Sequence, residues 1–126
     1  MKSCTDIEQS KKLAGILPIE SADMHYARIE DDDEMRDWEL YLSPIPKICA
    51  LYVENLPCWS LAALLRELPE TILGKDKDGY VVMVETMGSG LTTFADEPID
   101  ACYEMINKLN CYDYELRTKI QRGKDY

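Results

Sequence analysis

The hydrophobic and polar positions of this chain repeat with two different periods, and each period marks a different kind of element. Helical spacing is clearest for four leucines that fall at i, i+3, i+4 and i+7: Leu61, Leu64, Leu65 and Leu68. We predict a core helix here, closed by Pro69, because burying each leucine stabilises the fold by about 1.5–3 kcal/mol. Two starts remain open, since Ser60 is a candidate N-cap and Pro57 fits the first turn of a longer helix.

Two further helices are predicted at the ends of the chain. Thr5 and Glu8 have the spacing of a capping box, and we expect that helix to end near Leu17, before Pro18. A third helix is expected after Pro98. One face of it is apolar: Ile99, Cys102, Tyr103, Ile106 and Leu109.

Alternating apolar and polar residues predict strands between these helices. The first candidates are 24–29 (MHYARI), 38–42 (WELYL) and 47–53 (KICALYV). A second group of strands is expected over 71–94, with turns at 78–79 and 88–90. Within it, 80–86 is the strongest candidate because of its β-branched residues.

This order predicts an α+β fold, with a mainly antiparallel sheet of about five strands and three helices packed against it. The chain of 126 residues suits one domain, which we assign to 1–112. The polar tail 113–126 either prolongs the last helix or frays.

Composition and charge narrow the classes of partner. The 46% apolar content indicates a globular chain, and the formal charge of −10 disfavours direct contact with nucleic acid or anionic lipid. A basic protein, or a nucleic-acid-binding one, is the partner that this charge would attract. The first residues lack the apolar core of a signal peptide and no segment is long and apolar enough to span a membrane, so we expect a cytoplasmic protein. We expect it to be either a monomer or a homodimer.

Cys58 is the best candidate for chemistry among the five cysteines of the chain. A thiol near a helix N-terminus can have a lowered pKa, and His25 is the only histidine able to serve as its base. The alternative is that Cys58 is a small apolar core residue beside Trp59. We favour this alternative. The odd number of cysteines, without a CxxC pair, indicates neither a disulfide framework nor a zinc site.

The remaining motifs indicate surface features rather than catalysis. The acidic run 31–37 lacks the glycine and the ligand spacing of a calcium loop, so we expect a solvated turn, no metal and no cofactor. Tyrosines on separate predicted strands, together with Trp59, are candidates for a binding surface. They are Tyr26, Tyr41, Tyr52 and Tyr80. Packing within the core is the alternative.

Three blocks of the sequence together resemble a known group of proteins. They are CTDIEQSKKLAGILPIESADM (4–24), LPCWSLAALLRELP (56–69) and EPIDACYEMINKL (97–109), and the likeness spans residues 3 to 110. The group comprises short uncharacterised proteins of gut anaerobic bacteria and their prophages or other mobile elements. The resemblance implies a small cytoplasmic α+β domain and transfers no activity or catalytic residue.

Our leading hypothesis is a non-enzymatic accessory protein or inhibitor, of mobile-element origin, that binds another protein. It depends on the acidic charge, the small size and the absence of a catalytic motif. The alternatives are a thiol enzyme that uses Cys58 and a domain that binds a small molecule.

Overall fold

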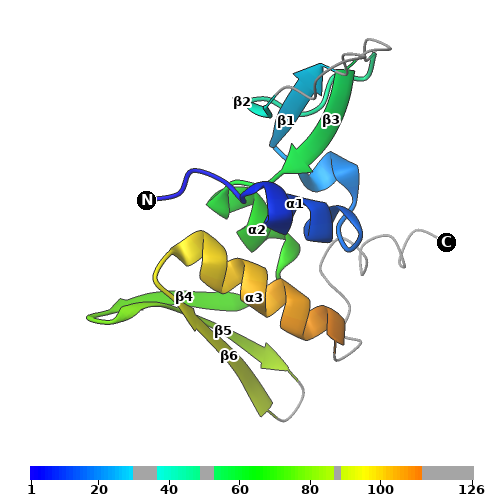
Figure 1. Cartoon of the computed structure of the whole chain (residues 1–126). Coiled ribbons are helices and arrows are strands. Elements are labelled where there is room, and N and C mark those ends of the chain that lie inside the picture. Colours follow the sequence, from blue (N-terminus) through cyan, green and yellow to red (C-terminus); the bar gives the residue numbers. More distant parts are fainter. Residues whose placement is uncertain (30–36, 49–52, 87–88, 112–126) are drawn as a thin grey trace, which may run out of the picture.

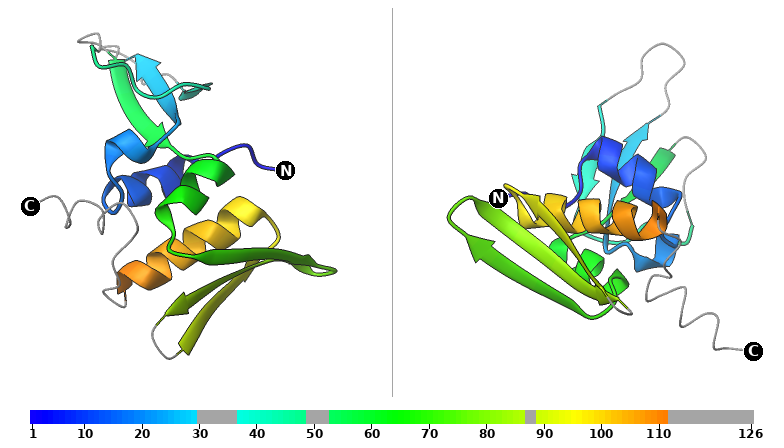
Figure 2. Two further views of the ribbon diagram at one scale, coloured as in Figure 1. Left: turned by 180° about the vertical axis from the view of Figure 1, so that it is seen from behind. Right: turned by 90° about the horizontal axis from the view of Figure 1, so that it is seen from below.

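The computed structural model describes residues 1–29, 37–48, 53–86 and 89–111, and it places helices between two three-stranded antiparallel sheets (Figures 1 and 2). The elements are α1 (Ile7–Ala14), η1 (Ile19–Ser21), β1 (Met24–Ile29), β2 (Glu39–Tyr41), β3 (Val53–Cys58), α2 (Leu61–Glu67), β4 (Thr71–Asp76), β5 (Gly79–Thr86), β6 (Ser89–Ala95) and α3 (Pro98–Cys111). The first sheet lies at one end of the molecule and the second at the other (Figure 1).

The predicted α+β class and antiparallel pairing are confirmed, but the strands form two sheets instead of one. The described residues hold six strands, in the orders β2-β1-β3 and β4-β5-β6. The chain passes from one sheet to the other through α2, so β3 and β4, on either side of that helix in sequence, belong to different sheets.

The first sheet confirms two predicted strands and corrects the third. β1 occupies 24–29 as predicted, and β2 lies within 38–42. Of the strand predicted at 47–53, Lys47 and Ile48 are not in a strand and Val53 is. β3 occupies Val53–Cys58 and pairs with β1 from Met24 opposite Cys58 to Ile29 opposite Val53. Residues 49–52 lie outside the described residues. Pro57 is tolerated in β3 because β3 is an edge strand, where a missing N–H need not break the ladder.

The capping box of α1 lies one residue later than predicted. Asp6 is the N-cap, its carboxylate accepts a hydrogen bond from the Gln9 N–H at 2.8 Å, and the Gln9 side chain returns a bond to the Asp6 N–H. Thr5 is instead buried, where its hydroxyl lies 2.8 Å from that of Ser10. The helix ends at Ala14, short of the predicted end, because Gly15 forms its C-cap.

The core lies between the second sheet and the helices. α3 packs on β5 and β6 and also contacts α2, whose buried face includes Leu64 and Leu68. Ser60 is the N-cap of α2, with its hydroxyl accepting from the Ala63 N–H at 3.2 Å, so the longer helix starting near Pro57 is not formed. The predicted third helix is confirmed as α3.

One glycine fixes the turn between β4 and β5. Gly79 has φ +144°, and a Cβ atom there would lie 2.5 Å from the carbonyl oxygen of Ala95. Only glycine fits this backbone conformation and this close approach to β6. The hairpin and the end of β6 are therefore held together at this corner of the second sheet.

Candidate functional site

The second sheet has one face in the core and one face in solvent. Successive side chains of a strand point to opposite faces, so the buried Val82 and Val84 place Val81 and Met83 on the other side. Met83 is 44% exposed, and on the neighbouring strands Ile72 and Phe94 are 62% and 68% exposed. The helices of the described part of the chain cover the opposite face (Figures 1 and 2).

These outward side chains are neighbours across the strands. Ile72 pairs with Met83, and Val81 pairs with Phe94. Cross-strand partners have side chains in contact distance, so the four residues form one patch, here called the outer apolar face (Ile72, Val81, Met83 and Phe94). Contiguous apolar surface of this kind marks interaction sites more often than scattered apolar residues do.

Carboxylates border the outer apolar face. Strand alternation places Asp76 and Glu85 on the same side as the patch, and Asp96 follows the end of β6. Asp76 and Asp96 line one shallow hollow together with Phe94. The outward positions of the described parts of β4, β5 and β6 contain no lysine or arginine. The patch is therefore apolar at its centre and acidic at its ends.

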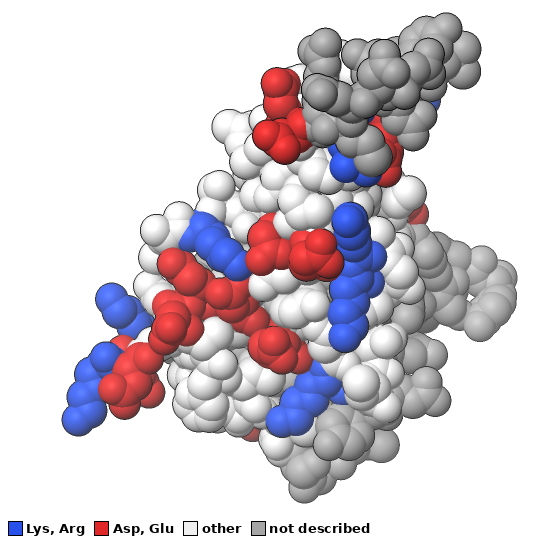
Figure 3. Space-filling model, viewed as in Figure 1, with Lys and Arg blue, Asp and Glu red and all other residues white. Residues whose placement is uncertain are grey.

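A second shallow groove lies on the other side of Phe94, along β6. It is lined by the β6 residues Thr92 to Ala95 and by the acidic side chains Asp6, Asp100 and Glu104. Its acidic wall comes from α1 and α3, whereas its floor is an edge strand. Acidic side chains extend from the β4–β5 hairpin across the start of α3 to α1 (Figure 3).

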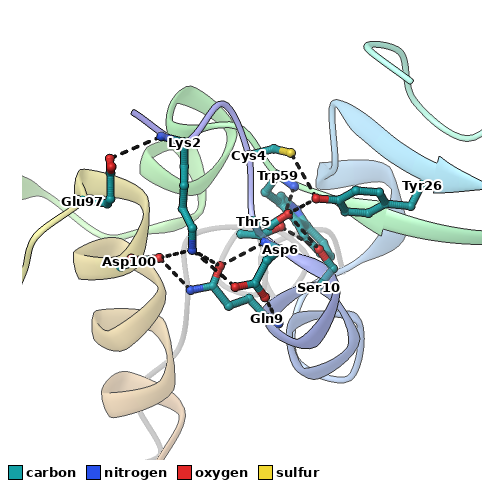
Figure 4. A network of polar contacts seen from close by, with 10 residues as sticks. All are labelled: Lys2, Cys4, Thr5, Asp6, Gln9, Ser10, Tyr26, Trp59, Glu97 and Asp100. Atoms are coloured by element: carbon teal, nitrogen blue, oxygen red, sulfur yellow. Dashed lines mark hydrogen bonds and ion pairs between the residues drawn. The ribbon is translucent and has the colours of Figure 1, made fainter. Parts of the chain in front are cut away.

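Lys2 occupies the upper end of this groove. Its ammonium donates to Asp100 at 2.7 Å and to Asp6 at 3.3 Å, while Gln9 also donates to Asp100 at 2.8 Å (Figure 4). Partial burial alone would raise the pKa of the Asp100 carboxyl, but the hydrogen bonds from Lys2 and Gln9 outweigh it and hold that pKa below its ordinary value. The acidic wall thus already binds one ammonium group.

The structure does not bring Cys58 and His25 together. Met24 is the register partner of Cys58, so the side chain of His25 points to the opposite face of the first sheet. His25 Nδ1 donates to the Ser43 carbonyl at 2.6 Å. Cys58 is fully buried at the end of β3, and burial, aided by the adjacent Cys4 thiol, raises the pKa of the Cys58 thiol.

Trp59 and Tyr26 serve packing within the molecule. Trp59 is fully buried, and its indole N–H donates to the Ser21 hydroxyl at 2.9 Å. The Tyr26 hydroxyl donates to the Thr5 carbonyl at 2.8 Å (Figure 4). The Trp59 side chain therefore holds η1 in place, and the Tyr26 side chain holds the segment before α1 against β1.

Tyr41 and Tyr80 lie in different sheets and do not share a surface. Tyr41, which is 44% exposed, stacks on His25 in the first sheet with ring centroids 5.1 Å apart. Tyr80 packs against the core of the second sheet, with Lys75 over its ring. Tyr52 lies outside the described residues.

No group of side chains in the described ranges has the composition of a metal site. Most of the acidic run 31–37, for which we expected a solvated turn, lies outside those ranges. None of the described helices is both long and apolar enough to cross a membrane.

The outer apolar face was not predicted, although the sequence contains a signal for it. Within YVVMVET, both alternating sets are apolar, since Tyr80, Val82 and Val84 interleave with Val81 and Met83. A strand with one solvated face normally alternates apolar with polar residues. An apolar pattern on both faces predicts that each face is covered, and within the described residues helices cover only one.

Comparison of the chain with protein-family models, with curated proteins and with solved structures finds no match.

Proposed function

We propose that this protein is a non-enzymatic binding protein that docks another protein on the outer apolar face of its second sheet. The observation that carries the proposal is the exposure of Ile72, Met83 and Phe94 on one sheet face bordered by carboxylates. The partner that fits has an apolar centre flanked by lysine or arginine. Burial of the apolar centre supplies affinity, and the charges supply orientation and rate of association.

Charge favours a different protein over a second copy of this chain. A homodimer formed through this face would bring together the carboxylates of Asp76, Glu85 and Asp96 from both copies. Like charges facing each other across an interface oppose association. A basic partner, such as a protein that itself binds nucleic acid, would be attracted by the formal charge of −10.

An accessory or inhibitory role agrees with this mode of binding. A small acidic protein that covers a basic surface prevents that surface from binding a polyanion. The mobile-element origin implied by the resemblance in sequence is part of this proposal. Nothing in the site favours a thiol enzyme, because Cys58 is buried and its thiol has a raised pKa. Nothing in it favours a small-molecule-binding domain either, because the two hollows beside Phe94 are shallow and acidic.

The test is retention of partners from a lysate of the source organism by three tagged proteins: wild type, Phe94→Asp and Leu42→Asp. Leu42 is a matched control because it is 75% exposed, against 68% for Phe94, and lies next to the first sheet. We expect a stoichiometric partner that wild type and Leu42→Asp retain at low salt and Phe94→Asp loses. Circular dichroism and thermal unfolding establish that both variants fold.

The identity of the contact is then checked by cross-linking the partner and mapping the linked peptides. Support requires that the linked surface of the partner contain apolar residues beside lysine or arginine. Equal retention by Phe94→Asp, linkage through the first sheet, or no protein retained by wild type would each overturn the proposed function.

A further inference from the structure

Among the described strands, β4 and β6 are the edges of the second sheet, and hairpin geometry shows which of their backbone groups point outward. The β4–β5 pairing closes at Asp76 and Gly79 across a two-residue turn, and such a closing pair is hydrogen-bonded. Bonding then alternates along β5, so the backbone of Val81 faces β4 and that of Val82 faces β6. Since Val82 pairs with Thr93, the backbone of Thr93 is bonded into the sheet.

The next backbone groups along β6 point out of the sheet. Alternation directs the N–H and C=O groups of Thr92 and Phe94 away from β5. A separate contact agrees, because the Lys108 ammonium donates to the Thr92 carbonyl at 3.3 Å. A lysine beside an unpaired strand edge is a common means of discouraging unwanted strand pairing.

The two sides of this edge differ in chemistry. On the solvent side lies the outer apolar face, which ends at Phe94. On the helix side lies the acidic groove with Asp100 and Glu104 of α3. The bond from Lys2 to Asp100 at 2.7 Å illustrates how a lysine side chain is held there (Figure 4).

We propose that the partner binds by adding an extended segment to the edge of β6, and that this segment alternates apolar residues with lysine or arginine. This inference rests on the proposed function and names the chemistry of its partner. Side chains of a strand point alternately to the two faces. The apolar ones extend the outer apolar face beside Phe94, and the basic ones reach Asp100 and Glu104.

The opposite edge of the sheet fits such a segment less well. By the same alternation, the outward backbone groups of β4 belong to Thr71, Leu73 and Lys75. Lys75 is exposed and is followed by Lys77 in the turn. Asp76 and Asp78 alternate with these lysines and leave this end of β4 without a net charge, whereas the acidic groove with Asp100 and Glu104 lies beside β6. We therefore assign strand addition to β6.

The first test compares two peptides of about eight residues, the length of an ordinary strand. One alternates valine with lysine, and the other contains the same residues as a valine block followed by a lysine block. The blocked peptide controls for attraction by charge alone. We expect the alternating peptide to bind wild type roughly tenfold more tightly. Only this peptide, when paired with β6, places its valines beside the outer apolar face and its lysines in the acidic groove. Equal affinity would overturn the inference.

The second test uses the backbone N–H of Thr92. Thr92→Pro removes that N–H without removing a bond to β5, and proline is tolerated in edge strands. We expect Thr92→Pro to lose the preference for the alternating peptide and Thr92→Ala to keep it. Retention of the preference by a folded Thr92→Pro protein would overturn the inference.

Two charge changes test the same edge in opposite directions and do not depend on proline. Glu104→Lys is expected to weaken binding of the alternating peptide roughly tenfold, whereas Glu70→Lys, an equal change of charge at another exposed position, is expected to change it little. Lys108→Ala uncovers the Thr92 carbonyl and removes a repelling charge, so it should tighten binding. Unchanged affinity in Lys108→Ala, or an equal loss of affinity in Glu104→Lys and Glu70→Lys, would count against strand addition.

The outcomes separate this inference from the proposed function. A partner that is lost from Phe94→Asp and retained by Thr92→Pro docks on the sheet face without adding a strand. That result would overturn the inference and support the function. A partner retained by Phe94→Asp would overturn the function itself.

Discussion

At the scale of single residues, Trp59 and Phe94 are aromatic side chains in opposite environments, the core and the surface. Trp59 is fully buried and hydrogen-bonded to Ser21, whereas Phe94 is 68% exposed. We expect Trp59→Ala to lower the free energy of unfolding by about 3–5 kcal/mol and Phe94→Ala by less than about 1 kcal/mol. Urea unfolding measures both. A large loss in Phe94→Ala would mean that this ring supports the fold and is no independent binding residue.

The cysteines permit a direct test of the thiol-enzyme alternative. Cys111 is exposed, whereas Cys58 and Cys102 are buried, and burial raises the pKa of Cys102 to about 12. Alkylation requires the thiolate, so Cys111 should react with iodoacetamide well before Cys58 at neutral pH. Mass spectrometry of timed samples gives the order. Labelling of Cys58 at the rate of Cys111 in the folded protein would revive the enzyme hypothesis.

At the scale of elements, the start of α1 distinguishes the predicted capping box from the observed one. Asp6 accepts from the Gln9 N–H, whereas Glu8 is solvent-exposed and lies 3.7 Å from Lys11. We expect Asp6→Ala to cost about 0.5–2 kcal/mol of unfolding free energy and Glu8→Ala less than about 0.5 kcal/mol. Thermal or urea unfolding of the two variants checks this. A larger cost for Glu8→Ala would favour the box that begins at Thr5.

Elements defined by local patterns were predictable, and elements defined by distant contacts were not. The leucine spacing of α2 and the β-branched run of β5 are local, and both were found from sequence. β3 contains Pro57 and polar residues, and it is a strand because β1 pairs with it along its whole length. Thr5 and Asp6 are equally good caps by sequence, and the burial of Thr5 against Trp59 decides between them.

The candidate site was harder to predict than the fold for the same reason. Met83 and Phe94 are ordinary strand residues in sequence, and only the position of α3 determines which face of the sheet stays open. Tyr26 and Tyr41 lie in the first sheet and Tyr80 in the second, and no pattern of spacing shows which strands share a face. Acidic charge was visible from composition, but its position beside β6 required the fold.

At the scale of the whole molecule, Lys2 joins the N-terminal segment to α3, and this link should depend on pH. The pKa of Asp100 is lowered from 3.8, so the link stabilises the fold above that value and is lost as the pH falls through the lowered pKa. We expect Asp100→Asn to cost less than about 1 kcal/mol near neutral pH, because the pair is partly exposed. The cost should vanish in acid. A constant difference across pH would exclude the ionised pair as its cause.

The charge of the whole chain predicts opposite effects of salt on folding and on binding. With a formal charge of −10, carboxylates repel one another in the folded state, so added salt should raise the unfolding temperature of the free protein. The same screening should weaken the complex, because attraction between the acidic border of the second sheet and a basic partner is reduced. Thermal unfolding and binding measured across one salt series give the two signs independently. A complex that is indifferent to salt while the free protein is stabilised would leave the apolar face as the binding surface and remove the basic character assigned to its partner.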